Sequence, residues 1–117
     1  MIPADLLDQL RKKDPELWER MRRMPVYVHQ DGQLTIDLTK SDNTELVAAW
    51  LQHCLQEAIR ARGWAYQVSC TFQGTRFAKI ATINPDGSKW FHDDQHAPTE
   101  AEALMRAYLS ALSGERI

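Results

Sequence analysis

The stretch "AAWLQHCLQEAIRARGWAYQVSCTF", residues 48–72, changes its hydrophobic period at Gly63. Before Gly63, apolar residues recur every three or four positions, which predicts one amphipathic helix. After Gly63 they alternate from Trp64 to Phe72, which predicts a β-strand with one face toward that helix. Glycine is common just past a helix C-terminus because it adopts a positive φ without strain. A helix that leads directly into a strand indicates a fold in which helices and sheet pack together.

The residues after this stretch predict two more strands and a closing helix. "RFAKIATIN" (76–84) and "SKWFHDD" (88–94) are joined by the turn sequence "NPDG". Thr99 followed by Glu102 has the form of a capping box, and apolar residues then recur at helical spacing up to Gly114. Residues 41–112 are therefore expected to form an α-β-β-β-α unit whose antiparallel sheet packs against helices.

The middle strand of this unit carries apolar residues on both of its faces. Phe77, Ala81 and Ile83 share one face, and Ala78 and Ile80 share the other. A sheet that is open to water on one side usually alternates more cleanly between apolar and polar residues. We therefore expect the N-terminal helices or a second subunit to cover the remaining face.

Residues 1–40 predict two short helices and a hairpin. In "KKDPELWERMRRM" (12–24), Asp14 can cap a helix that begins at Pro15, so helices are expected at about 3–13 and 15–24. "VYVHQDGQLTIDL" (26–38) alternates around Asp31 and Gly32, which favour a tight turn. With a short tail at 113–117, the chain is expected to be a single α+β domain over residues 1–117.

Composition restricts the classes of function. The chain has 117 residues, 44% of them hydrophobic, which suits one core. Its 14 basic and 16 acidic residues give a net charge of -2, so no global field attracts nucleic acid or an anionic membrane. We expect a soluble, cytoplasmic protein with no membrane partner, since no stretch approaches the ~18 apolar residues of a span. Cys54 and Cys70 fall in apolar stripes and are expected to be buried free thiols.

The polar stretch "HDDQHAPTE" (92–100) is the main candidate for chemistry. His92, Asp93, Asp94 and His96 are residue types that bind divalent metals. A zinc site, however, needs three or four convergent ligands held by further contacts, and this stretch resembles a turn. We interpret it as a solvated connection between a strand and a helix, and expect neither metal nor cofactor.

No other pattern indicates catalysis. Asp93 and Asp94 are adjacent in a strand, so they project to opposite faces and cannot flank one substrate bond. Each cysteine lies in an apolar stripe rather than in an exposed, electropositive setting. The glycines are isolated turn or cap residues and do not form a phosphate-binding loop. We therefore expect no catalytic residues, and a protein that is not an enzyme.

Two groups of residues are candidates for binding a partner. The first is a cationic edge in "RMRRM" beside an exposed contact formed by Met21 and Met24, which would suit nucleic acid or an acidic protein. Its alternative is a solvated helix face balanced by Glu16 and Glu19. The second group belongs to the sheet, where Trp90 shares a strand face with His92 and is the tryptophan expected to reach the surface. The partner-binding candidates are Arg20, Arg22, Arg23, Arg76, Trp90 and His92.

The order of elements is similar to that of two known groups of proteins. Double-stranded RNA-binding domains share the helix, three strands and helix, but their final helix begins with lysines, whereas "PTEAEALMRA" begins with two glutamates. The segments "AAWLQHCLQEAIRARGWAYQVSCTF", "NPDGSKWFHDD" and "PTEAEALMRAYLSAL" resemble those of small phage-encoded ABA-sandwich proteins. This resemblance covers residues 41–112. It implies a phage or prophage origin and supplies no catalytic residues.

These observations lead to three functional hypotheses. The first is a homo-oligomeric phage-type interaction protein that acts in the host cytoplasm by binding and inhibiting a host protein such as a defence component (an anti-CRISPR or similar). The second is a small-ligand or nucleotide-sequestering protein whose pocket lies at a subunit junction near Arg76, Trp90 and His92. The third is a nucleic-acid-binding accessory protein that uses the "RMRRM" edge.

Overall fold

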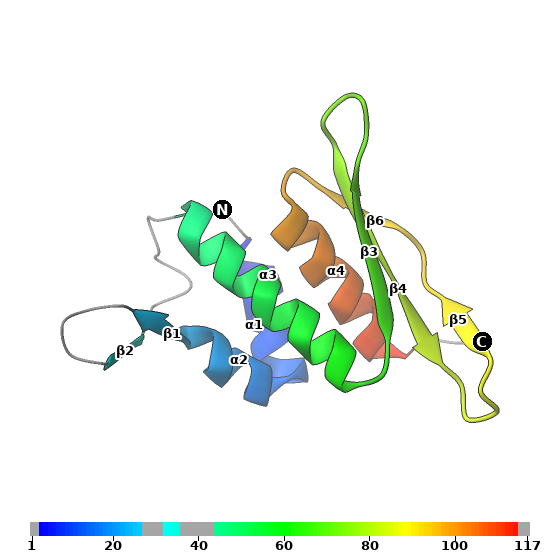
Figure 1. Ribbon diagram of the computed structural model, residues 1–117, viewed down its shortest axis with the longest axis horizontal. Helices are drawn as coiled ribbons and strands as arrows, with labels where there is room; N and C mark the ends of the chain where they lie inside the picture. The colour runs from blue at the N-terminus through cyan, green and yellow to red at the C-terminus, as the bar shows by residue number, and fades with distance from the viewer. Residues whose placement is uncertain (1–2, 27–31, 36–43, 115–117) are drawn as a thin grey trace.

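The computed structural model describes residues 3–26, 32–35 and 44–114, and shows helices before and after an antiparallel sheet (Figure 1). The predicted α+β class is confirmed. The elements are α1 (Ala4–Lys13), α2 (Pro15–Arg22), β1 (Arg23–Val26), β2 (Gly32–Thr35), α3 (Thr44–Ala61), β3 (Ala65–Cys70), β4 (Arg76–Ile83), β5 (Lys89–Phe91), β6 (Gln95–Ala97) and α4 (Glu100–Ser113).

Strand β4 is the centre of the main sheet. It pairs with β3 on one side, from Arg76 to Ala81, and on the other side with β5 and then β6. A single third strand was expected over 88–94, and the structure instead has two three-residue strands on either side of His92, Asp93 and Asp94. Part of "HDDQHAPTE" is therefore strand rather than connection.

Local capping chemistry fixes the start of α2 and both ends of α4 as predicted. The Asp14 side chain accepts a hydrogen bond from the Leu17 N–H at 3.2 Å and starts α2. The Thr99 hydroxyl likewise accepts from the Glu102 N–H at 3.2 Å and starts α4, which ends at Gly114 with φ of +65°. Such caps satisfy backbone N–H groups that have no partner inside the helix.

The end of α2 differs from expectation. The helix stops at Arg22, two residues early, and Arg23 begins β1, which pairs with β2 through Arg23 opposite Thr35 and Val26 opposite Gly32. The expected hairpin therefore starts three residues sooner. Of its expected turn residues, Asp31 lies outside the described part of the chain, and Gly32 begins β2.

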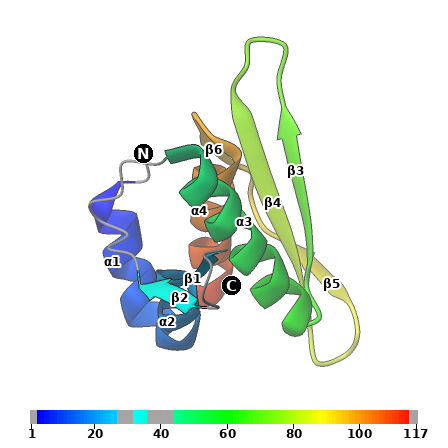
Figure 2. The ribbon, with the colours of Figure 1, turned by 60° about the vertical axis from the view of Figure 1, so that its left-hand side comes forward.

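All four helices lie on one side of the main sheet (Figure 2). Helices α3 and α4 contact the sheet, while α1 and α2 pack on the far side of α3 and α4. Of the two alternatives expected for the second face of the sheet, coverage by a second subunit stays a prediction, and coverage by the N-terminal helices is wrong. The reason is that α4 is apolar around most of its circumference, so it offers one side to the sheet and another to α1. Its fully buried residues are Ala103, Leu104, Met105, Ala107 and Tyr108.

The two cysteines differ in environment. Cys54 of α3 is completely buried, as predicted, whereas Cys70 is exposed. The prediction for Cys70 is wrong because β3 runs past the helices, so alternation places its thiol on the helix side where no helix covers it. Among the described residues, no helix is both long and apolar enough to cross a membrane.

Candidate binding surface

The face of the main sheet that points away from the helices is a continuous surface. Residues directly opposite each other on paired strands share a face, so the register defines which side chains lie there. We call this the open sheet face. It consists of Ala65, Gln67, Ser69, Phe77, Lys79, Ala81, Ile83, Lys89, Phe91 and His96. No helix of the described chain covers it (Figure 2).

Apolar side chains are concentrated at two places on the open sheet face. Phe91 is 66% exposed and lies opposite Ala81, next to Ile83, which is 51% exposed. Farther along β4, the ring of Phe77 packs against that of His96, with 5.5 Å between centroids. Large apolar side chains are seldom left this exposed together unless they contact something, so this patch is a candidate for binding.

Two lysines contribute positive charge to the open sheet face. Lys79 lies between the two aromatic positions, and Lys89 lies opposite Ile83. Asp93 and Asp94 lie between β5 and β6, where no register pair assigns them to either face. Sequence reasoning did not identify this surface, although the apolar residues on both faces of the middle strand were the signal that could have found it.

Trp90 and His92 lie on the opposite face of the sheet from Phe91. Trp90 is paired with Thr82, and Thr82 Oγ1 lies 3.2 Å from His92 Nε2, within hydrogen-bond distance. Trp90 is 39% exposed, and the other three tryptophans are more buried. Trp90 and His92 therefore share one face of the sheet, as expected. They lie at a corner of the sheet beyond the helices.

Arg76 does not join this corner. Arg76 and Thr82 are six positions apart in β4, a distance of about 20 Å along a strand. Its guanidinium donates to the carbonyl oxygens of Gly74 at 2.9 Å and Pro98 at 3.4 Å, so it ties the β3–β4 turn to the start of α4. Within one chain, Arg76, Trp90 and His92 thus do not line a common pocket.

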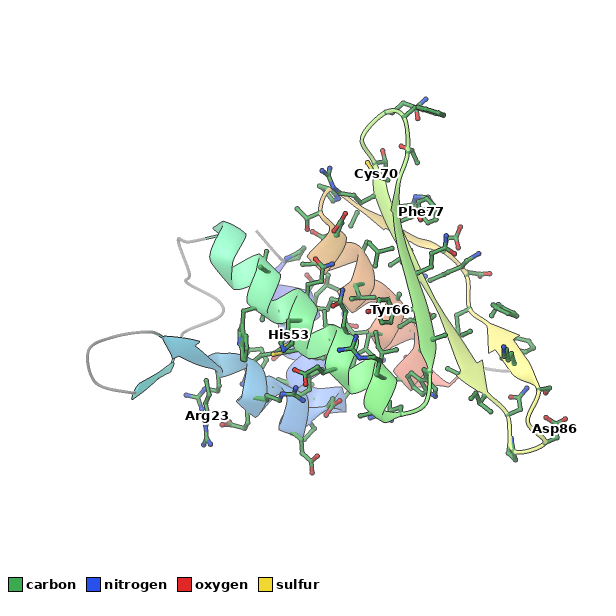
Figure 3. The ribbon with its side chains drawn as sticks, in the orientation of Figure 1. Arg23, His53, Tyr66, Cys70, Phe77 and Asp86 are labelled. Carbon is green, nitrogen blue, oxygen red and sulfur yellow. The ribbon has the colours of Figure 1, made fainter. Side chains whose placement is uncertain are left out.

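The "RMRRM" arginines are each paired with a glutamate. Arg20 contacts Glu57 of α3 at 2.5 Å, and its hydrogen bond lowers the pKa of that carboxyl. Arg22 and Arg23 both contact Glu19, at 3.1 and 3.8 Å. These pairs offset the positive charge of the edge, which lies on the helical side of the molecule, where Figure 3 labels Arg23 and His53.

The methionine next to these arginines does not form an exposed contact. Met21 is completely buried in the core, so the expectation of an exposed methionine beside the arginines is wrong for this residue. It is buried because its position in α2 faces α3, where the Trp50 indole N–H also donates to the Met21 carbonyl oxygen at 2.8 Å. The side chain of Met24 lies outside the described part of the chain.

The two histidines of "HDDQHAPTE" point to opposite faces of the sheet. His92 contacts Thr82 on the helix side, whereas His96 packs on Phe77 in the open sheet face. In the described ranges, no three His, Cys, Asp or Glu side chains are gathered in a way that could hold a metal ion. Burial raises the pKa of the Cys54 thiol to about 11, so this sulfur is protonated and unreactive at neutral pH.

A shallow hollow of about 490 Å³ lies where the open sheet face meets the β3–β4 turn. It is lined by Gln73, Gly74, Thr75, His96, Ala97 and Pro98. His96 is its single ionisable group, so the hollow offers few of the convergent polar groups that a small-ligand site uses. The open sheet face is the larger and more distinctive surface.

Comparisons with family models, with curated proteins and with solved structures each found no match for this chain.

Proposed function

We propose that this protein is a non-enzymatic interaction protein that binds a protein partner through the open sheet face. One observation carries the proposal: Phe91, Ile83 and the Phe77–His96 pair are displayed on the face of the sheet opposite to the one on which α3 and α4 pack. Because the backbone of these residues is already fixed by strand pairing, binding orders their side chains alone, which lowers its entropic cost.

The chemistry of the open sheet face defines the partner. Burying an exposed phenylalanine or isoleucine side chain contributes about 1.5–3 kcal/mol, so Phe91 and Ile83 are suited to be the energetic centre of an interface. Lys79 and Lys89 beside them favour a partner surface that carries carboxylates around an apolar patch, since complementary charge speeds encounter and selects partners. The partner we propose is therefore an acidic protein surface.

The resemblance to small phage-encoded proteins adds the biological setting. It supports a host protein as the partner, for example a component of a defence system, and inhibition by occupation of a surface as the mode of action. No catalytic step is required for such inhibition.

The test is retention of a partner from bacterial lysate on immobilised wild-type protein and on three variants. Phe91→Ser removes the apolar centre, and Lys89→Glu reverses charge on the open sheet face. Lys12→Glu is the control, because Lys12 is also an exposed lysine, lies in α1 at 3.1 Å from Asp8, and is remote from the sheet.

We expect the wild type and Lys12→Glu to retain one protein at stoichiometric level, and Phe91→Ser and Lys89→Glu to lose it. Recovery of no protein, or equal recovery by all four, contradicts the proposal. Recovery that nuclease abolishes also contradicts it, and would instead assign the face to single-stranded nucleic acid, which also stacks on aromatic side chains beside lysines.

A further inference from the structure

The two edge strands of the main sheet differ in how well they are protected from pairing with a strand of another chain. The edge formed by β5 and β6 is divided into two short strands and carries Lys89, Asp93, Asp94 and Pro98 in or beside them. Short, charged and proline-containing edges are the usual defence against pairing with another chain. The edge formed by β3 is six residues long and has neither a charged residue nor a proline. No strand of the described chain pairs with its outer side.

Two observed hydrogen bonds show which residues of β3 have backbone N–H and carbonyl groups that point away from β4. The Thr71 N–H donates to the Thr75 carbonyl, and on the other side of β4 the His92 N–H donates to the Ile80 carbonyl. Alternation along an antiparallel ladder then directs the backbone groups of Tyr66, Val68 and Cys70 away from β4. These outward groups form a complete edge that a further strand can use.

The side chains of β3 are also incompletely covered. Tyr66 and Val68 lie on the helix side of the sheet and are half-buried, although their β4 neighbours Ala78 and Ile80 are completely buried. Beyond the end of β3, Phe72 is fully exposed in the turn that projects past the helices (Figure 1). An additional strand beside β3 would remove apolar surface of all three from water.

We propose that a second copy of this chain pairs its β3 with this edge, antiparallel and related by a two-fold axis at Val68. In this register Tyr66 of each copy lies opposite Cys70 of the other, so every outward N–H and carbonyl of the three residues is paired. Trp64 is not needed in the ladder, because its N–H already donates to the Ile59 carbonyl at 3.1 Å. Extension of the register places Trp64 of each copy near Phe72 of the other.

A second copy fits this edge better than an unrelated strand does. A two-fold interface requires a self-complementary surface, and an uncharged strand of hydrogen-bonding groups meets its own copy without like-charge repulsion. The product is one continuous sheet that has the helices of both copies on the same side. This inference does not depend on the proposed function, because the residues of the edge differ from those of the open sheet face that the partner assay tests.

The first test is the mass of the native particle for the wild type, Cys70→Pro and Cys70→Ser. Proline at 70 removes an outward N–H that β4 does not use, whereas serine also removes the thiol but keeps the N–H. We expect the wild type and Cys70→Ser to have twice the 13.5 kDa chain mass and Cys70→Pro to have the mass of one chain. A monomeric wild type, or a dimer that Cys70→Pro leaves intact, overturns the proposal.

A second pair of variants keeps the test decisive if Cys70→Pro does not fold. Val68→Lys places two ammonium groups beside each other at the two-fold axis, and Val68→Thr changes the same side chain without charge. We expect the lysine variant alone to be monomeric, with both variants folded by circular dichroism. Dimers of both would overturn the proposal.

The register has its own test by oxidation in the Cys70→Ser background. Val68→Cys places a thiol opposite its own copy, so we expect it to form an intermolecular disulfide. Ala65→Cys is the control, since its copy lies six residues away along the ladder, and we expect no cross-link. Cross-linking of Ala65→Cys but not Val68→Cys contradicts this register.

Discussion

The Tyr108 hydroxyl donates a hydrogen bond to Asp14 Oδ2 at 2.5 Å and so joins the middle of α4 to the junction between α1 and α2. The same hydroxyl accepts from Arg62 Nε at 3.1 Å, and the Arg62 guanidinium lies 5.1 Å from the centre of the Trp64 ring. Because Asp14 also caps α2, one carboxylate both starts a helix and attaches it to the core. This contact helps to hold the N-terminal helices behind α3 and α4.

Substitution of Tyr108 by phenylalanine should destabilise the protein. The change removes the hydroxyl that donates to a partly buried carboxylate, and a hydrogen bond to a charged group contributes about 1.5–3 kcal/mol. The measurement is the free energy of unfolding in urea. Tyr66→Phe is the control, because the Tyr66 hydroxyl only accepts a hydrogen bond from Arg60 at an exposed position, 3.2 Å away. If the two substitutions lower the free energy of unfolding equally, the Asp14–Tyr108 hydrogen bond contributes no more to stability than the exposed one.

Alkaline pH should weaken the fold through the same tyrosine. Burial, together with the hydrogen bond to Asp14, raises the pKa of Tyr108 from 10.0 to about 12. The unfolded chain therefore loses this proton first, so the stabilisation is complete below pH 10 and disappears as the pH rises to about 12. Urea unfolding at a series of pH values should show this loss in the wild type and a smaller one in Tyr108→Phe. Parallel pH profiles would contradict the assignment.

The two thiols should differ sharply in reactivity. Cys70 is exposed, whereas burial of Cys54 raises its pKa to about 11. We expect an aromatic disulfide reagent to modify one thiol per native chain rapidly and the second only after unfolding. In Cys70→Ser the rapid phase should be absent. Rapid modification of Cys54 in that variant would mean that α3 opens more readily than its packing indicates.

The cap of α4 should contribute measurably to stability. Thr99→Ala removes the hydroxyl that accepts from the Glu102 N–H, and loss of such a cap costs about 1 kcal/mol. Thr99→Ser keeps the hydroxyl and should unfold within about 0.5 kcal/mol of the wild type. Thermal or urea unfolding of the two variants provides the comparison, and an alanine variant as stable as the serine variant would be inconsistent with this role.

Changes on the open sheet face should affect binding without affecting folding. Phe91 and Lys89 are exposed in β5, so Phe91→Ser and Lys89→Glu should each change the free energy of unfolding by less than about 0.5 kcal/mol. Circular dichroism and urea unfolding check this in the same preparations as the partner assay. A large loss of stability in either variant would make its loss of a partner uninformative about the surface.

The parts of the fold that local chemistry determines could be predicted from the sequence. Asp14 with Pro15, Gly63, and Thr99 with Gly114 each act on neighbouring backbone groups, and the helix ends follow from them. The position of α1 and α2 could not be predicted in this way. It depends on contacts between distant segments, such as the hydrogen bond between Asp14 and Tyr108.

The open sheet face was not predicted as a binding surface, for the same reason. The partners of the "RMRRM" arginines include Glu57, which is remote in sequence from Arg20. The exposure of Cys70 depends on how far β3 extends past the helices rather than on its alternation. The two apolar faces of β4 were visible in the sequence, but which of them the helices would leave uncovered required the three-dimensional arrangement.

The stacking of every helix behind one face of the sheet separates the residues that fold this chain from those that it displays. Side chains such as Phe91 and Ile83 contribute little to the core, so they can change in sequence without unfolding the protein. Substitutions on the open sheet face, whether natural or engineered, could therefore change which partner it binds while the fold stays the same.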